Sequence, residues 1–263
     1  MLWLTFRQHR AQVAATAALL VAIGTALLVN AATATVDDAG FGVLAPLMTW
    51  LPILPVAVGV FWGAPLVAAE HERGTALLAW TQSVSRDRWV AVKLALLGTA
   101  VTAGGLLFGV MVQAWLDHYA GIPEANRFAH GYFVLTGVVP GLWWLFAFLL
   151  GAALGAVLRR TVAAMAVTVG ALLVVMLALT RLRGYYVDPV LVPMDGPFDG
   201  QVFAGADRWL FVKPVLGPSA AVPGMLVQPA DRYWRFQWTE AAILGTASLA
   251  LAGAAVAAVR RRA

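Results

Sequence analysis

Glu70-His71-Glu72-Arg73-Gly74-Thr75 is a short charged stretch that separates two long apolar segments, residues 46–69 and 91–115. Each apolar segment meets the requirement of about 20 predominantly apolar residues for a membrane helix. Charges are costly inside hydrocarbon, so the stretch between two such helices must lie at one face of the membrane. The alternation of apolar segments with charged breaks predicts a helical protein that crosses the membrane several times.

The composition supports this class. The chain has 263 residues, of which 61% are hydrophobic and only 12% are charged, whereas soluble domains carry about 25% charged residues. It contains no cysteine, which excludes disulfides and thiolate chemistry. The net charge of +5 comes largely from short arginine-bearing segments beside apolar spans. This placement follows the positive-inside bias of membrane proteins and gives no indication of nucleic-acid binding.

Six segments are long and apolar enough to cross a membrane. We expect an all-α fold in which residues 1–263 form a single transmembrane domain with spans at residues 11–30, 46–69, 91–115, 132–157, 161–180 and 239–259. Most arginines fall in one alternate set of connections, residues 1–10, 70–90, 158–160 and 260–263. The positive-inside rule places this set in the cytoplasm. The expected location is therefore the cell (plasma) membrane, with both termini cytoplasmic.

The N-terminal residues 1–10 alternate apolar and polar side chains. Trp3 and Phe6 suit a short helix in the membrane interface, and the alternative is an unstructured basic flank. Ala32-Thr33-Ala34 resembles a signal-peptide cleavage site. The apolar run before it is longer than the usual core of about 7–15 residues, so we expect this first span to be retained.

Two patterns predict how the spans pack. The second span is rich in proline, which removes an amide donor and bends a helix; its prolines are Pro46, Pro52, Pro55 and Pro65. Glycines four residues apart share one helix face and allow another backbone to approach closely. Such pairs occur at Gly59/Gly63, Gly105/Gly109, Gly137/Gly141 and Gly151/Gly155. We interpret them as packing faces and assign no dimer interface from them.

The outer segment 181–238 is much longer than the ~15 residues beyond which structureless loops are uncommon. Its aromatic residues favour short helices that rest on or dip into the outer leaflet. A membrane-embedded enzyme or an assembly factor that acts through this segment is the alternative function. Its candidate residues have no catalytic spacing; they are Asp188, Asp195, Asp199 and Asp207.

Motifs for enzyme chemistry are missing. His71-Glu72 does not continue to HExxH, because Thr75 stands where the second zinc ligand is needed. The chain also has no GxxxxGK[ST] sequence and so no P-loop for ATP. The outer residues Asp117, His118, Glu124 and His130 have no metal-ligand spacing. We therefore predict no catalytic site, no metal site and no cofactor bound by this chain.

Charges within the spans are almost absent, which argues against an ion-coupled carrier. Lys93 lies near the inner end of the third span, where it can extend to the interface, and Glu240 lies near the outer end of the sixth. The energy for transport would then have to come from another protein.

The charged stretch continues through residues 76–90 and has the features of a docking element. Glu70 and Glu72 are expected near the start of a helix, where the helix dipole favours acidic groups. Leu77 and Trp80 have no reason to occur in a solvated basic loop, which is the alternative. They suit the headgroup region or a groove on a partner. A short helix lying across the cytoplasmic face is therefore expected.

The sequence resembles the membrane subunit of ABC exporters of the type-2 permease class, in its actinobacterial style. The resemblance covers nearly the whole chain, and its most specific part runs from Glu70 through Thr75 to Lys93. In that family this loop forms the coupling helix that docks on a separate ATPase. The resemblance implies this partner-binding role for Glu70, Glu72, Arg73, Gly74 and Thr75, together with Leu77 and Trp80. His71 between the acids is a departure that leaves the charge pattern intact.

The resemblance also implies an alternating-access exporter of which this chain is the non-enzymatic transport subunit. ATP and Mg²⁺ would bind to the partner ABC ATPase subunit, and a second permease subunit, identical or not, would complete the path within the membrane lipid. The apolar spans favour a lipophilic or amphipathic substrate. Neither the substrate nor the residues that line its path can be named from the sequence.

Overall fold

The computed structural model describes residues 2–72, 86–122, 124–193, 210–215 and 224–261. Within these ranges, six helical segments are long and apolar enough to cross a membrane, as predicted; they are Arg10–Thr33, Ala45–Glu72, Arg88–His118, Val139–Leu158, Thr161–Arg183 and Ala230–Arg260. Most extend a few residues beyond the predicted spans. The fourth starts later than predicted, because residues 132–138 form a short helix and a turn in which Gly137 has φ +69°.

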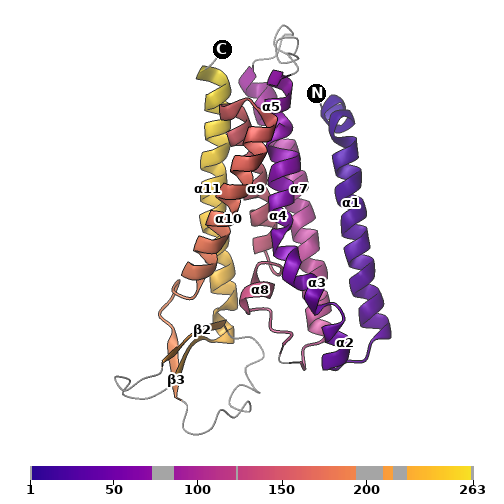
Figure 1. Ribbon diagram of the computed structural model, residues 1–263, viewed down its shortest axis with the longest axis vertical. Coiled ribbons are helices and arrows are strands. Elements are labelled where there is room, and N and C mark those ends of the chain that lie inside the picture. Colours follow the sequence, from indigo (N-terminus) through magenta and orange to yellow (C-terminus); the bar gives the residue numbers. More distant parts are fainter. Residues whose placement is uncertain (1, 73–85, 123, 194–209, 216–223, 262–263) are drawn as a thin grey trace.

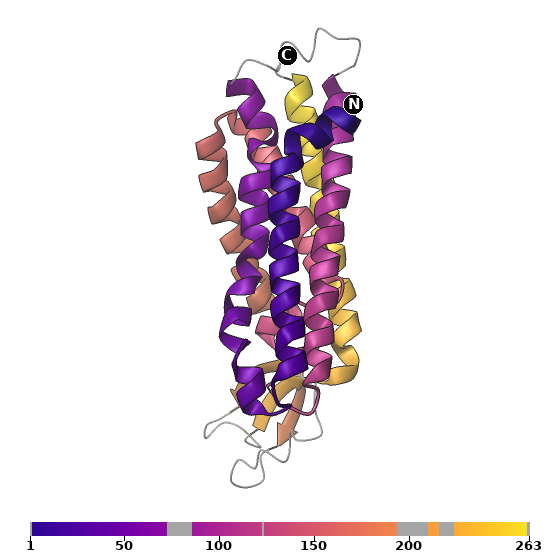
Figure 2. The same ribbon diagram turned by 90° about the vertical axis from the view of Figure 1, so that its right-hand side faces the viewer.

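The described helices form one elongated bundle (Figures 1 and 2). They are α1 (Leu2–Thr33), α2 (Asp38–Gly42), α3 (Ala45–Trp50), α4 (Leu54–Val58), α5 (Pro65–Glu72), α7 (Arg86–His118), α8 (His130–Phe133), α9 (Val139–Leu158), α10 (Thr161–Arg183) and α11 (Tyr233–Arg261). Figure 1 shows both termini and the end of α5 at one end of the bundle, which we call the termini end. A small sheet lies at the opposite end, which we call the sheet end.

The segment expected as a separate interfacial helix belongs to α1. The helix runs without a break from Leu2 to Thr33, and Figure 2 shows its first turns bent away from the long axis. At the sheet end, the Asn30 side chain ties α1 to α7 by accepting hydrogen bonds from Trp115 Nε1 at 2.8 Å and from the Tyr119 hydroxyl at 2.9 Å.

The second span is interrupted, which confirms the expectation from its prolines. It passes from α3 through a 3₁₀ turn, Leu51–Ile53, into α4, then through a π-helical turn, Gly59–Gly63, into α5. Proline removes an amide donor from the ladder, and a π turn accommodates an extra residue. Gly59 and Gly63, at the two ends of the π turn, lie against α9.

Helix α9 lies at the centre and contacts α7, α10, α11 and the second span. Glycines make this packing possible. A Cβ added at Gly63 would stand 2.3 Å from Phe148 O, and one at Gly151 would stand 2.3 Å from Gly59 O. On the other side of α9, a Cβ at Gly105 would stand 2.8 Å from Pro140 O. The pairs Gly59/Gly63, Gly105/Gly109 and Gly151/Gly155 are thus packing faces within the chain, as predicted. Gly137 lies in a turn before α9, so Gly137/Gly141 does not share a helix face.

Gly151→Ala is expected to destabilise the protein, whereas Gly170→Ala is not. Both variants add one methyl group to a membrane helix, but a Cβ at Gly170 meets nothing within 4 Å. Alanine is intrinsically the better helix former by about 1 kcal/mol, so a lower unfolding temperature for Gly151→Ala must come from the clash with the second span. Thermal unfolding in detergent compares the two variants. Equal unfolding temperatures would contradict the packing.

The segment between the last two spans forms a sheet where it is described, so the expectation of short helices there is wrong. Strands β1 (Val190–Pro193), β2 (Leu210–Val215) and β3 (Gly224–Gln228) pair antiparallel in the order β1-β3-β2. Val190 pairs with Val227, and Leu210 pairs with Gln228. These short runs contain valine and are bounded by proline and glycine, which favours strands over helices.

Gln228 fastens this sheet to the bundle. Its side-chain amide donates to Gly184 O at 2.9 Å and to Val187 O at 2.6 Å, just beyond the end of α10. A second glutamine, Gln237 in α11, accepts from the backbone amides of Val138 and Val139 at 3.0 Å each and so caps the start of α9. The sheet end is therefore held by buried side-chain amides.

Candidate functional site

The proposed docking stretch begins at the last turn of α5, at the termini end. Glu70, His71 and Glu72 are described there. The other predicted partner-binding residues lie outside the described residues; they are Arg73, Gly74, Thr75, Leu77 and Trp80. The site is therefore built from the two glutamates and the helices that they contact.

Glu70 joins α5 to α7. Its Oε1 accepts from Lys93 Nζ at 2.5 Å. Lys93 is only 5% exposed, and its ammonium group lies 4.1 Å from the centre of the Trp89 ring. A buried ammonium requires a partner, and the carboxylate and the ring supply it. Lys93 thus binds the end of the neighbouring helix.

Glu72 joins α5 to α10. Its Oε1 accepts from the Thr161 backbone amide at 2.9 Å, and its Oε2 accepts from the Thr161 hydroxyl at 2.6 Å. Thr161 is the first residue of α10, and the preceding Arg160 makes no side-chain cap. The carboxylate of one helix therefore caps the first amide of another.

The two glutamates end a helix and do not begin one, contrary to the sequence prediction. Acidic groups at a helix C-terminus face the negative end of its dipole, which is unfavourable by about 0.3–1 kcal/mol each. Here the cost is offset from outside α5, because Glu70 meets the Lys93 ammonium and Glu72 meets the positive end of α10. Of the two glutamates, only Glu72 meets the start of a helix, and that helix is α10.

This arrangement links one helix end to two long helices. Helix α7 runs from the glutamate pair to the sheet end, and α10 does the same beside α9 (Figures 1 and 2). The link between α9 and α10 is a tight turn in which Arg159 has φ +55°. A displacement of the end of α5 would therefore be carried to both helices by charge-assisted bonds, which are the strong ones. Among the described residues, the end of α5 is thus bonded to both α7 and α10.

A second polar cluster, at the sheet end, was missed by the sequence analysis. Glu240 of α11 is fully buried and accepts from Arg183 of α10 through Nε at 2.9 Å and Nη2 at 3.0 Å. Trp143 Nε1 of α9 also donates to Glu240 at 3.0 Å, and the Phe133 ring centre lies 4.3 Å from the guanidinium carbon. The sequence did offer a signal for this pair, because Arg183 and Glu240 carry opposite charges near the outer ends of the fifth and sixth spans.

Two titratable side chains, Tyr186 and His130, lie near this pair. Burial raises the pKa of the Tyr186 phenol, and the charge of Glu240 acts in the same direction. Burial lowers the pKa of His130, and the charge of Arg183 lowers it further.

The other candidate residues do not gather into a site. Among the described residues, no three side chains of histidine, aspartate and glutamate are placed to hold a metal ion. His71 Nδ1 lies 3.0 Å from Val67 O of its own helix. Of the four outer aspartates, only Asp188 is described, and its backbone carbonyl accepts from Arg232 at 2.8 Å.

Comparison with known proteins identifies the family. Residues 2–183 match the model of the family described as ABC-2 membrane transporter related. No curated protein and no solved structure matched the chain. The match includes α1 to α10 and both glutamates of the site. The chain therefore belongs to the ABC-2 membrane transporter related family.

Proposed function

We propose that this protein is the permease subunit of an ATP-driven exporter, and that residues 70–90 receive the motion of a separate ABC ATPase subunit. The single observation that carries the proposal is the double link at the end of α5. Glu70 binds Lys93 of α7, and Glu72 caps α10. A loop held in this way cannot move without pulling on two helices of the bundle.

The topology supports this role. The arginine-rich connections favour a cytoplasmic termini end, and the ATPase and ATP would lie on that side. The chain has no P-loop of its own, and family membership implies an ATPase partner in general terms. ATP and Mg²⁺ bind to that partner in the proposal, while this chain remains a non-enzymatic subunit of the plasma membrane.

Alternating access follows from the links. Closure of the ATPases on ATP pushes residues 70–90, and α7 and α10 then tilt against the central α9. A second permease subunit supplies the other wall of the path, and the substrate is lipophilic or amphipathic. The large exposed aliphatic side chains of α10, such as Val162 and Val174 at 78% and 68% exposure, leave one face of the bundle for lipid or that subunit.

Co-purification tests the partnership. The tagged chain, taken from its native membrane in mild detergent, is expected to retain a protein that an azido-ATP photolabel marks. Trp80→Ala should reduce this retention about tenfold or more, since tryptophan anchors in interfaces are often worth over ~2 kcal/mol. Trp50→Ala is the matched control because Trp50, 71% exposed, lies in α3 near the sheet end.

Two outcomes would contradict the partnership. One is a wild-type chain that retains no photolabelled protein under conditions that preserve its fold. The other is an equal loss of the ATPase in Trp80→Ala and Trp50→Ala, which would show that docking does not involve residues 70–90.

A further inference from the structure

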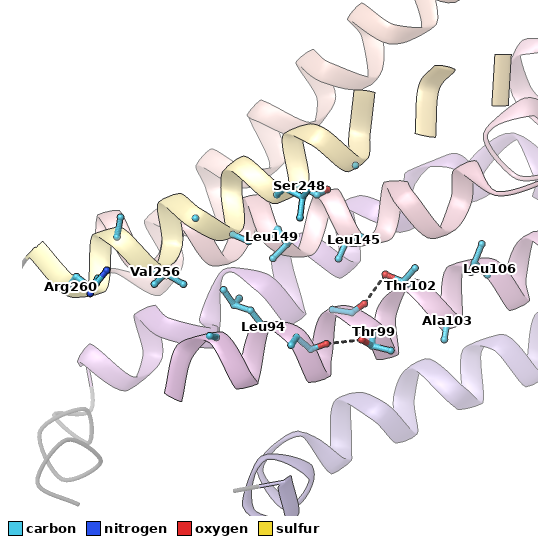
Figure 3. A pocket seen from close by; sticks show the side chains of 18 residues that line it. Leu94, Thr99, Thr102, Ala103, Leu106, Leu145, Leu149, Ser248, Val256 and Arg260 are labelled. Atoms are coloured by element: carbon cyan, nitrogen blue, oxygen red, sulfur yellow. Dashed lines mark hydrogen bonds between the residues drawn. The ribbon is translucent and has the colours of Figure 1, made fainter. Parts of the chain in front are cut away.

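We propose that the groove between α7, α9 and α11 binds one acyl chain of an anionic phospholipid, with the lipid phosphate beside Arg260. The groove has a volume of about 800 Å³, within the range of roughly 300–1,000 Å³ that ligand pockets occupy. Figure 3 shows its lining residues on the three helices, with Arg260 at one end and Leu106 at the other. The proposal is independent of the ATPase.

The shape of the groove fits a chain that enters from one leaflet. Its lining on α7 extends from Ala91 to Leu106. At a rise of 1.5 Å per residue this is about 22 Å, compared with about 30 Å for the whole hydrocarbon core. The walls include Leu94, Leu145 and Leu149. An apolar occupant is favoured here, because each buried methylene contributes about 0.8 kcal/mol.

Glycine leaves the space open on the α11 side. Gly245 and Gly253 both line the groove. A Cβ added at Gly253 would meet nothing within 4 Å, and one at Gly245 would meet only Leu142 Cδ1 at 3.8 Å. The chain can therefore accept a larger side chain at either position without a clash. Such a side chain would occupy the groove itself.

The termini end of the groove is basic. Arg260 lines it, Arg261 and Arg262 follow in the sequence, and the exposed Arg88 lies near the start of α7. A juxtamembrane arginine attracts anionic lipid by about 1 kcal/mol. An apolar groove with arginines at one end suits a lipid whose acyl chain lies in the groove and whose phosphate lies beside the arginines. Ser248, which is 1% exposed, also lines the groove. Its hydroxyl Oγ has no hydrogen-bond partner in the described part of the chain.

The same charges disfavour a second copy as the occupant. A second copy that packed its own groove against this one, as in a two-fold symmetric contact, would bring the two Arg260 side chains together. Like charges held together repel one another. A phospholipid neutralises these arginines, whereas another copy adds to them.

Lipid retention by the purified full chain, measured by native mass spectrometry, tests the proposal. Phosphatidylglycerol and phosphatidylcholine with identical acyl chains are the probes. The wild type is expected to retain one phosphatidylglycerol at least fivefold more tightly than phosphatidylcholine. Gly253→Leu should weaken this retention about tenfold or more, whereas Gly170→Leu, on an open face of α10, should change it less than twofold. Arg260→Gln should remove the preference for phosphatidylglycerol.

Several results would overturn the proposal. Equal retention of the two lipids by the wild type would exclude recognition of the anionic headgroup. Equal behaviour of Gly253→Leu and Gly170→Leu would exclude the groove as the site. If Gly253→Leu converts dimers to monomers and leaves lipid retention unchanged, the groove binds a second copy. None of these measurements involves the ATPase, so the lipid proposal can fail while the proposed transport function stands, and the reverse.

Discussion

Glu72→Ala is expected to uncouple the permease, leaving the ATPase bound but lowering the nucleotide-induced movement of α10 about tenfold. The variant removes both bonds to Thr161, at 2.9 and 2.6 Å. Hydrogen bonds to a charged group contribute about 1.5–3 kcal/mol, and every 1.4 kcal/mol changes an equilibrium about tenfold. The fraction of molecules in which the end of α5 still moves α10 should fall accordingly.

Spin labels measure this effect. The native chain has no cysteine, so cysteines introduced at Leu182 of α10 and at Val43, which are 56% and 67% exposed, can be labelled selectively. The distance between them is compared in the nucleotide-free and the nucleotide-trapped complex. Glu124→Ala, which removes an exposed carboxylate between α7 and α8, is the control. An undiminished distance change in Glu72→Ala would show that Glu72 does not transmit the motion.

Arg183→Met is expected to have the largest effect on stability, about 3–5 kcal/mol. Glu240 is fully buried and accepts two hydrogen bonds from Arg183. Without the guanidinium, the buried carboxylate keeps only the Trp143 and Tyr186 donors among the described residues. Removal of one partner of a buried ion pair is far costlier than removal of both. The double variant Arg183→Met/Glu240→Leu should therefore recover much of the loss.

Thermal unfolding in detergent compares the stability of these variants with that of the wild type. Arg183→Met should unfold about 10 °C below the wild type. Arg181→Met is the matched control, because Arg181 lies in the same last turn of α10 and is exposed. If the two variants unfold at the same temperature, the pair does not hold α10 to α11.

The spans and their packing faces could be predicted from the sequence because both depend on local composition. Lipid imposes a minimum length of apolar residues, so hydropathy located all six spans. Close backbone approach requires glycine, so pairs such as Gly151/Gly155 identified the faces on α9. Proline likewise indicated the breaks between α3 and α5.

The partners of charged residues could not be predicted in the same way, because they come from distant parts of the chain. Glu72 and Thr161 are 89 positions apart, and Arg183 and Glu240 are 57 apart. Position near a span end suggested that Lys93 would reach the interface, but the fold pairs it with Glu70. The fold likewise pairs Glu240 with the buried Arg183. The sheet was missed because its strands are short and pair across long separations.

The central claim is that an ATPase docks on residues 70–90, and site-specific photocrosslinking tests it most directly. A photoreactive phenylalanine analogue is placed at Trp80 or, as the control, at Trp238, which is 62% exposed in the first turns of α11. The account predicts that the probe at Trp80 crosslinks in cells to a protein that binds ATP, and that the probe at Trp238 does not. Crosslinking of that protein from Trp238 but not from Trp80 would contradict the account.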